Sequence, residues 1–325
     1  QVVHVNLDPQ LILLLRETHY LNQEPFNIRL PEAAKELLRN TNAFELRVTA
    51  TRLETIVSKY NTIMRTMTQF EKPLFERKLA KIDILFEQGL QELTWKMKES
   101  SDFIESAMAL VCVDVHQNLD IVQTNCHEVA EITISWSKGK LDVFSARDPK
   151  LSYSMEELLG MQMRLIEEHE NLVVPSGNKI HSLVGECFEA AQISHASPAW
   201  QDFIDYIDAI ILDGLKQATL TSLKSMLNNL VQANMSEDDE NVIPILTIRL
   251  ELIDNRVAFR PPLDQSTSVV SVQELVHQWL EGFLARGRLV KMLALKGSYQ
   301  DYISADEEVK QILSDINKLV EENSE

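Results

Sequence analysis

The sequence predicts a mainly α-helical protein, built as an elongated series of packed long-helix bundles with one small β-hairpin near residues 243–262. Three observations predict this fold class. Large apolar residues recur every seven positions over long stretches, glycine contributes only 9 of 325 residues, and the apolar period changes to two in one short stretch. Positions three, four and seven apart share one face of an α-helix, whereas a period of two indicates a strand.

The stretch from Asn42 to Phe70 has the clearest helical pattern. Its two apolar rows consist of Leu46, Leu53, Tyr60, Met67 and Leu74, and of Ile56, Ile63 and Phe70. At about 1.5 Å per residue, such a helix is about 43 Å long, so it needs other long helices beside it to bury its apolar stripe.

Further helices are predicted along the rest of the chain. Several begin at a proline or at a residue that can cap free amides, such as Asp8-Pro9 and Ser197-Pro198. We expect Pro73 to end the first long helix by clashing with the preceding turn, and Val174 to Asn178 to form a turn. The expected helices are Leu11 to Leu21, Pro31 to Leu38, Leu74 to Leu93, Ser101 to Trp136, Ser154 to Val173, Lys179 to Ile193, Ser197 to Leu230, Val272 to Leu295 and Ala305 to Val320.

The stretch from Ile245 to Leu252 is expected to be a half-buried strand, because apolar residues occupy every second position. These residues are Leu246, Ile248, Leu250 and Leu252, and they alternate with Ile245, Thr247, Arg249 and Glu251. Asp254-Asn255 is expected to form the turn of a hairpin, with Val257 to Phe259 as the partner strand. Since two isolated strands are marginally stable, we expect the hairpin to dock on the helices.

The predicted organisation has four parts: a first helical bundle over residues 1–100, a second over 101–235, an acidic loop and the hairpin over 236–270, and helices over 271–325. The chain begins at Gln1 without an initiator methionine, which is typical of a piece of a longer polypeptide.

Charge and cysteine content exclude several function classes. The net charge is −18, which disfavours nucleic acid and anionic membranes as partners but leaves basic proteins possible. Three cysteines are too few for a disulfide framework and suit a reducing cytosol, and no apolar run reaches the roughly 20 residues of a membrane span.

The sequence contains no phosphate loop, no G-x-G-x-x-G motif and no G-x-S-x-G elbow. Four possible zinc ligands share a broad face of one predicted helix and raise the question of a zinc-binding site. They are Cys112, His116, Cys126 and His127. However, His116 and Cys126 would lie about 15 Å apart along the helix, whereas zinc ligands lie within about 2.3 Å of the metal. We therefore predict no catalytic residue, cofactor, metal or small-molecule substrate.

Two runs of acidic residues remain as candidates. Glu167 to Glu170 matches no cation-binding motif and is interpreted as a solvated charge run. The candidate partner-binding residues are Glu237, Asp238, Asp239 and Glu240, which form a solvated loop or bind a basic partner.

A family resemblance adds what residue chemistry alone does not supply. Several short segments resemble segments in the tails of dynein heavy chains and follow one another in the same order. They are Val5 to Leu21, Ile56 to Asn61, Glu71 to Leu74, Ile82-Asp83, Gly89-Leu90, Leu93 to Trp95, Phe259 to Leu263, Gly297 to Tyr299 and Asp306 to Val309. The amino-acid sequences of Arg16 to Leu21 and of Leu93 to Trp95 are more similar to those of axonemal (ciliary) dyneins than to those of the cytoplasmic type.

The resemblance implies a non-catalytic portion of a microtubule motor, with the ATP-hydrolysing AAA+ ring outside these residues and the last helices leading toward the motor linker. The implied partners are dynein intermediate and light chains, other dynein heavy chains, and axonemal docking or neighbouring-arm proteins. The implied location is cytoplasmic and cytoskeletal, in the axoneme of a cilium or flagellum.

Two alternatives stay open. The first is an elongated helical scaffold or tethering subunit of another large assembly, for example in vesicle tethering. The second is a helical enzyme with a buried site, which would need titratable residues that converge from several helices.

Overall fold

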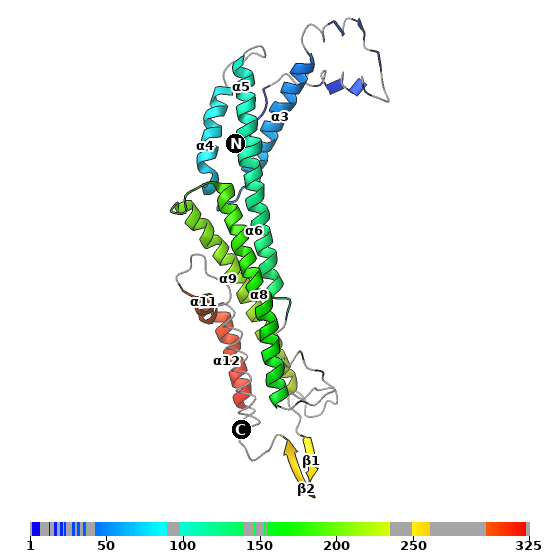
Figure 1. Cartoon of the computed structure of the whole chain (residues 1–325), viewed down its shortest axis with the longest axis vertical. Helices are drawn as coiled ribbons and strands as arrows, with labels where there is room; N and C mark the ends of the chain where they lie inside the picture. The colour runs from blue at the N-terminus through cyan, green and yellow to red at the C-terminus, as the bar shows by residue number, and fades with distance from the viewer. Residues whose placement is uncertain are drawn as a thin grey trace. The chain divides into compact units, whose positions relative to one another are not determined.

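The computed structural model describes residues 2–6, 43–89, 98–139, 155–234, 249–260 and 297–322, with isolated positions between 13 and 36 and at 146, 148 and 153. Its elements are α3 (Ala43–Thr66), α4 (Lys72–Gly89), α5 (Lys98–Ala107), the π-helix η1 (Met108–Val115), α6 (His116–Trp136), α8 (Met155–Ala191), α9 (Pro198–Asn234), β1 (Arg249–Ile253), β2 (Arg256–Arg260), α11 (Tyr299–Ala305) and α12 (Glu307–Glu322) (Figure 1). The mainly α fold with one small hairpin is therefore confirmed. In the part of the chain described, no helix has the length and hydropathy needed to cross a membrane.

The chain divides into two compact units, each made of two separate stretches. Unit 1 consists of Gln1–Thr124 and Glu186–Trp200, and unit 2 of Asn125–Gly185 and Gln201–Glu325. The boundaries fall inside α6, α8 and α9, so these long helices contribute residues to both units. The predicted four-part organisation follows other boundaries and stays a prediction.

The π-helix η1 is the centre of unit 1, because α3 and α4 pack against it and α5 continues directly into it (Figure 1). Val111 and Val115 of η1 are fully buried, and so is Phe75 of α4. Ile56 and Ile63 of the first apolar stripe are also buried on α3. Tyr60 is buried as well, whereas Leu46, Leu53 and Met67 are partly exposed, so the centre of the stripe packs as the sequence predicts.

The β-branched stretch Val111 to Val115, which could locally pass for a strand, lies in η1. The buried residues here are four apart: Ala107, Val111, Val115 and Leu119. A spacing of four exceeds the 3.6 residues of an α-helical turn, so a regular helix would rotate some of them out of the core. The wider i→i−5 pattern, seen in the hydrogen bond from the His116 amide to the Val111 carbonyl, keeps them on one face.

The first long helix ends earlier than predicted. It runs to Thr66 instead of Phe70, and Pro73 lies in the first turn of α4 instead of ending α3. The missing N–H of a proline has no cost in the first helical turn, where the amides lack intrahelical partners. Proline therefore marks the start of the next helix here.

Unit 2 contains the ends of α6 and most of α8 and α9, with α11 and α12 beside α9 (Figure 1). Its core includes Trp136 of α6, Val173 and Ile180 of α8, and Phe203 and Ile211 of α9. Ala218, Thr219 and Leu220 are consecutive and all buried, so this part of α9 is covered on more than one face.

The predicted turn at Val174 to Asn178 is wrong, because α8 is one helix with Pro175 inside it. Proline removes one backbone hydrogen bond, which costs about 3 kcal/mol in an isolated helix. Burial on both sides of the proline explains why the helix continues, because Val173 and Ile180 are fully buried. Tertiary packing therefore outweighs the local preference.

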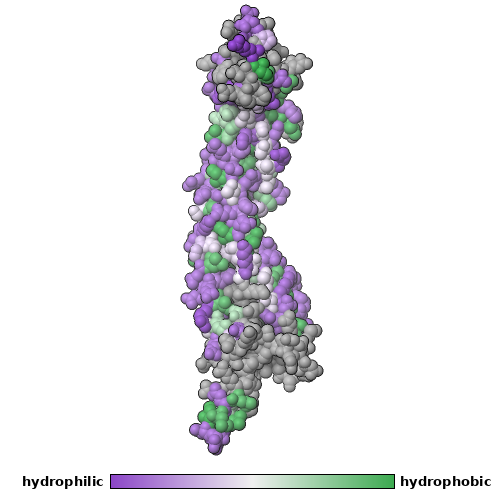
Figure 2. Space-filling view, turned by 90° about the vertical axis from the view of Figure 1, so that its right-hand side faces the viewer, coloured by the Kyte–Doolittle hydropathy of each residue, from purple (hydrophilic) through white to green (hydrophobic). Residues whose placement is uncertain are grey.

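The hairpin is confirmed, with Leu250 paired to Phe259 and Leu252 to Val257. Asp254 and Asn255 form the turn with φ of 50° and 60°, which is typical of the turn that matches the strand twist. The expected docking is not seen against any helix that the structure describes, because Leu250, Leu252 and Val257 are 67%, 73% and 62% exposed. In Figure 2 the hairpin presents a hydrophobic patch bordered by hydrophilic residues.

The remaining predictions have mixed outcomes. The helix from Ser197 is confirmed, and the predicted last helix, Ala305 to Val320, corresponds to α12. The short helix α11, which precedes it, was not predicted. The expected helix Val272 to Leu295 lies outside the described residues, and those at Leu11 to Leu21 and Pro31 to Leu38 lie largely outside them.

Candidate functional site: helix junctions and an open groove

The segment Ile56 to Asn61, which contributes to the family resemblance, lies where α3 meets its neighbours. The Asn61 side chain accepts from the Val3 amide at 3.0 Å and donates to the Val3 carbonyl at 2.8 Å, as a neighbouring strand would. Lys59 donates to Nε2 of His116 on α6 at 3.1 Å. Both residues therefore hold other segments against α3.

Tyr60 makes the contact between α3 and α4. Its hydroxyl donates to the Asp83 carboxylate at 3.4 Å, and its ring lies 4.9 Å from that of Phe86. Burial, followed by the Asp83 charge and this hydrogen bond, raises the pKa of Tyr60 above its ordinary value. The hydroxyl therefore stays protonated and remains a donor.

The turn between α3 and α4 is closed by a capping box that includes Glu71 of the segment Glu71 to Leu74. The Thr68 amide donates to the Glu71 carboxylate at 2.8 Å, and the Glu71 amide donates to the Thr68 hydroxyl at 3.3 Å. Gln123 of α6 donates both to Glu71 and to the Thr66 carbonyl at the end of α3, at 3.0 and 3.2 Å. The side-chain amide of Gln123 thus connects α6 to the end of α3 and to the turn that precedes α4.

A part-buried ion pair joins α4 to η1, with Lys78 as its buried member. Lys78 lies 2.7 Å from the Asp114 carboxylate, and its ammonium group lies 5.8 Å from the Phe75 ring centre. Asn118 also donates to Asp114, to its carbonyl and to its carboxylate. Removing one partner of such a pair leaves a poorly solvated charge, so the pair contributes to a specific helix arrangement.

In unit 2, three polar contacts connect α6 and α8 at successive positions along the two helices. Asn125 donates to the Leu183 carbonyl at 3.1 Å, Lys179 pairs with Glu128, and His169 lies 3.3 Å from the Trp136 carbonyl. These contacts fix the register of the two antiparallel helices.

The segments Gly297 to Tyr299 and Asp306 to Val309 attach α11 and α12 to α9. Ser298 and Asp301 form a capping box, and the buried Tyr299 hydroxyl donates to the fully buried Asp208 carboxylate. Lys216 pairs with Asp306 at 2.7 Å.

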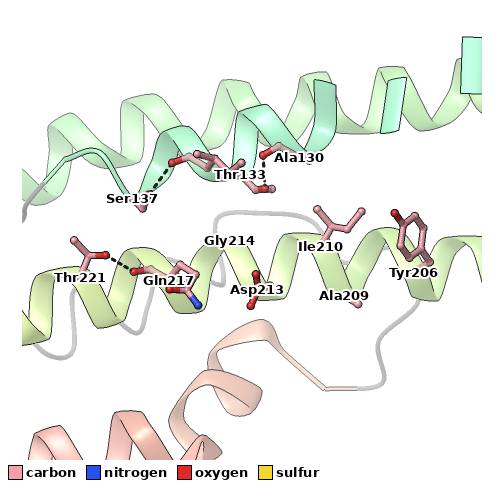
Figure 3. Close-up of a pocket in the computed structure, with 11 residues that line it drawn as sticks. Ala130, Thr133, Ser137, Tyr206, Ala209, Ile210, Asp213, Gly214, Gln217 and Thr221 are labelled. Atoms are coloured by element: carbon pink, nitrogen blue, oxygen red, sulfur yellow. Dashed lines mark hydrogen bonds between the residues drawn. The ribbon is translucent and has the colours of Figure 1, made fainter. Parts of the chain in front are cut away.

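An open groove of about 500 Å³ lies between α6 and α9 within unit 2 (Figure 3). Its lining residues are Ala130, Thr133, Ile134 and Ser137 on α6, and Tyr206, Ala209, Ile210, Asp213, Gly214, Gln217 and Thr221 on α9. At its base, a Cβ on Gly214 would lie 2.4 Å from the Thr133 Cβ. Glycine is therefore required for the close approach of the two helices.

The predicted site residues have the following outcomes. Glu237, Asp238, Asp239 and Glu240 lie outside the described residues. Cys112 donates to the Met108 sulfur at 3.9 Å and His116 contacts Lys59, so each has a structural partner. Burial raises the pKa of the Cys112 thiol, which Lys59 partly offsets. Among the described residues there is no group of three metal ligands.

Sequence reasoning missed the polar contacts at these junctions. Two of them had a signal that could have found them, the patterns Thr68-x-x-Glu71 and Ser298-x-x-Asp301, which are typical of helix starts. The buried pair Asp208–Tyr299 had none, because its members are 91 positions apart.

The fold and these contacts define a helical packing module, in which polar residues of the described segments connect helices. A family model described as "Dynein heavy chain, N-terminal region 1" matches residues 1–103. The "Dynein beta chain, flagellar outer arm" of Chlamydomonas reinhardtii is 27% identical over 97% of the chain. The human "Dynein axonemal heavy chain 9" is 29% identical over 81% of the chain, and the "Dynein beta chain, ciliary" of Heliocidaris crassispina 27% over 97%.

The chain spans 6–7% of the length of these relatives. The resemblance to the N-terminal tail of dynein heavy chains of the axonemal type is thereby confirmed.

Proposed function

We propose that this chain is a non-catalytic tail segment of a dynein heavy chain that acts as a structural scaffold. It links an ATP-driven microtubule motor to associated chains, to neighbouring heavy chains and to the axonemal doublet. One observation carries the proposal: the described residues of the resembling segments, such as Asn61, Glu71 and Tyr299, make contacts that connect helices with one another or with the N-terminal residues.

The chemistry of the described residues supports a mechanical role. The charged pairs Lys78–Asp114 and Lys216–Asp306 each join two different elements. Such pairs and the side-chain caps favour one arrangement of long helices. A scaffold needs this property because bound chains keep their spacing only when the helices between them do not rearrange.

The proposed partners are dynein intermediate and light chains, other dynein heavy chains, and axonemal docking or neighbouring-arm proteins. The names of the relatives refer to a flagellar outer arm, an axoneme and cilia, and we propose the axoneme as the location of this chain. The loop Glu237 to Glu240 is proposed to bind a basic partner, and no cofactor or small-molecule substrate is proposed.

The test is affinity purification of the tagged chain after expression in a ciliated cell, with mass spectrometry of the proteins that bind. We expect axonemal dynein intermediate, light and heavy chains. The control is Ile56→Asp, which places a charge at a buried position of α3 and should lose these proteins together with the fold. Recovery of vesicle-tethering proteins in place of dynein chains would support the alternative scaffold and refute this proposal.

A further inference from the structure

We propose that the groove between α6 and α9 binds an amphipathic helix of a partner chain, with Lys or Arg side chains flanking its apolar stripe. The inference rests on the proposed scaffold function and names the chemistry of one partner at one surface. It is carried by the shape, the exposed apolar floor and the charge of the groove.

The floor of the groove presents apolar groups that the packing of unit 2 leaves open. Ile134 of α6 is 52% exposed, and Ala209 of α9 is also exposed. Tyr206 and Ile210 line the same side of α9 and are partly exposed (Figure 3). An apolar floor between two packed helices is the surface that an added helix covers with residues at i, i+3, i+4 and i+7.

The length of the groove fits a helix. Its lining on α9 runs from Tyr206 to Thr221, which is about 23 Å of helix. A partner segment of about 16 residues, or four turns, would cover it. At the base, Gly214 and Thr133 bring α6 and α9 together, so the floor is continuous across the two helices.

The edges of the groove are acidic. Asp213 lines it, and Asp202 and Asp205 precede the lining residues Tyr206 and Ala209 by one helical turn on the same face. On α6, Glu131 precedes Ile134 by three positions.

All four carboxylates are exposed, and none forms an ion pair with a described residue. Among the described residues, the cations nearest in sequence are Lys138, which follows the lining residue Ser137, and Lys216. Lys216 pairs with Asp306 and also interacts electrostatically with Asp213, so it offsets only part of the acidic charge. This charge favours a basic partner and disfavours a second copy of the chain, because two acidic grooves would repel each other.

The test uses two synthetic 18-residue helical peptides with the same apolar stripe, flanked by Lys in one and by Glu in the other. Binding to the full 325-residue chain is measured by fluorescence anisotropy. We expect the Lys peptide to bind at least tenfold more tightly than the Glu peptide. The variants Ile134→Glu and Asp213→Lys should each weaken the binding of the Lys peptide at least tenfold.

Matched controls are Ile84→Glu, at a 62% exposed position on α4, and Asp120→Lys, at an exposed position of α6 in unit 1. Neither should change binding, and circular dichroism should show that all four variants fold. Absent binding, equal binding of the two peptides, or binding unchanged by Ile134→Glu would overturn the proposal.

A third peptide, residues 272–295, tests whether the chain fills its own groove. Tighter, groove-dependent binding of this peptide would overturn the assignment to a partner chain. If the peptide assays fail while the tagged chain still recovers axonemal dynein chains, only the groove proposal is refuted.

Discussion

The buried hydrogen bond from Tyr299 to Asp208 is a contact of unit 2 whose loss should lower the stability of the chain. Tyr299→Phe removes the donor while keeping the ring, so a fully buried carboxylate has one donor fewer. We expect the free energy of unfolding to fall by about 1–3 kcal/mol, measured by urea denaturation. Tyr302→Phe is the control, because Tyr302 is 42% exposed and should change stability by less than about 0.5 kcal/mol. Equal effects of the two variants would contradict the role of Tyr299.

The ion pair Lys216–Asp306 predicts a pH dependence for the attachment of α12. The hydrogen bond between them lowers the pKa of Asp306 below its ordinary 3.8 and raises that of Lys216 above 10.5. The Asp306 contribution is present above pH 3.8 and disappears as the pH falls through the lowered value. The Lys216 contribution is present below pH 10.5 and disappears as the pH rises through the raised value.

We therefore expect Lys216→Gln to lower the free energy of unfolding by at most about 1 kcal/mol at pH 7, since the pair is partly solvated. The difference from the parent chain should shrink in acid, as Asp306 becomes protonated. Denaturation curves at several pH values measure it, and a difference that stays constant from pH 7 to pH 2 would contradict the assignment.

At the scale of residues, the sequence identified segments that make these contacts but not which residues meet. Asn61, Tyr60 and Tyr299 lie in segments identified from the sequence. However, their partners Val3, Asp83 and Asp208 are 58, 23 and 91 positions away. Local sequence patterns do not indicate which residues meet when they lie tens of positions apart in the sequence. Only the helix caps could be recognised from the sequence, because both of their residues lie within four positions.

At the scale of helices, the close packing of α6 and α9 depends on Gly214. Gly214→Ala would place a Cβ 2.4 Å from the Thr133 Cβ, so the helices must separate. We expect a loss of about 1–3 kcal/mol in the free energy of unfolding. Gly160→Ala in α8 is the matched control. It has no atom within 4 Å of the added Cβ, so removing a helical glycine should stabilise the chain by about 0.5–1 kcal/mol. Opposite signs for the two variants are the decisive result of thermal or urea unfolding.

The hairpin gives a test of docking. If its apolar side chains are exposed in solution as in the structure, Leu250→Thr and Leu252→Thr should change the free energy of unfolding by less than about 0.5 kcal/mol. Each should also reduce self-association measured by light scattering, because an exposed apolar strand favours association. A loss of about 2 kcal/mol or more per substitution would instead show that the hairpin is docked on helices, as the sequence predicted.

Helix periodicity explains which elements could be predicted. The long helices α3, α6 and α9 were found because their apolar repeats persist over many turns. The misplaced turn at Pro175 and the unrecognised π-helix η1 have one cause. In both, burial outweighs local preference: the buried Val173 and Ile180 keep α8 helical through a proline, and the four-residue spacing of Val111 and Val115 selects wider turns.

At the scale of the whole molecule, the scaffold proposal predicts that the chain does not bind ATP. The sequence has no phosphate loop, and a net charge of −18 repels a polyphosphate unless a dedicated site compensates. A site with a dissociation constant of about 10 μM would raise the free energy of unfolding by about 2.7 kcal/mol at 1 mM MgATP, which is easily seen as a thermal shift. We expect no shift beyond that caused by 1 mM magnesium pyrophosphate, which controls for ionic strength and metal. A shift specific to ATP, or steady release of phosphate by the purified chain, would show a nucleotide site and favour the helical-enzyme alternative.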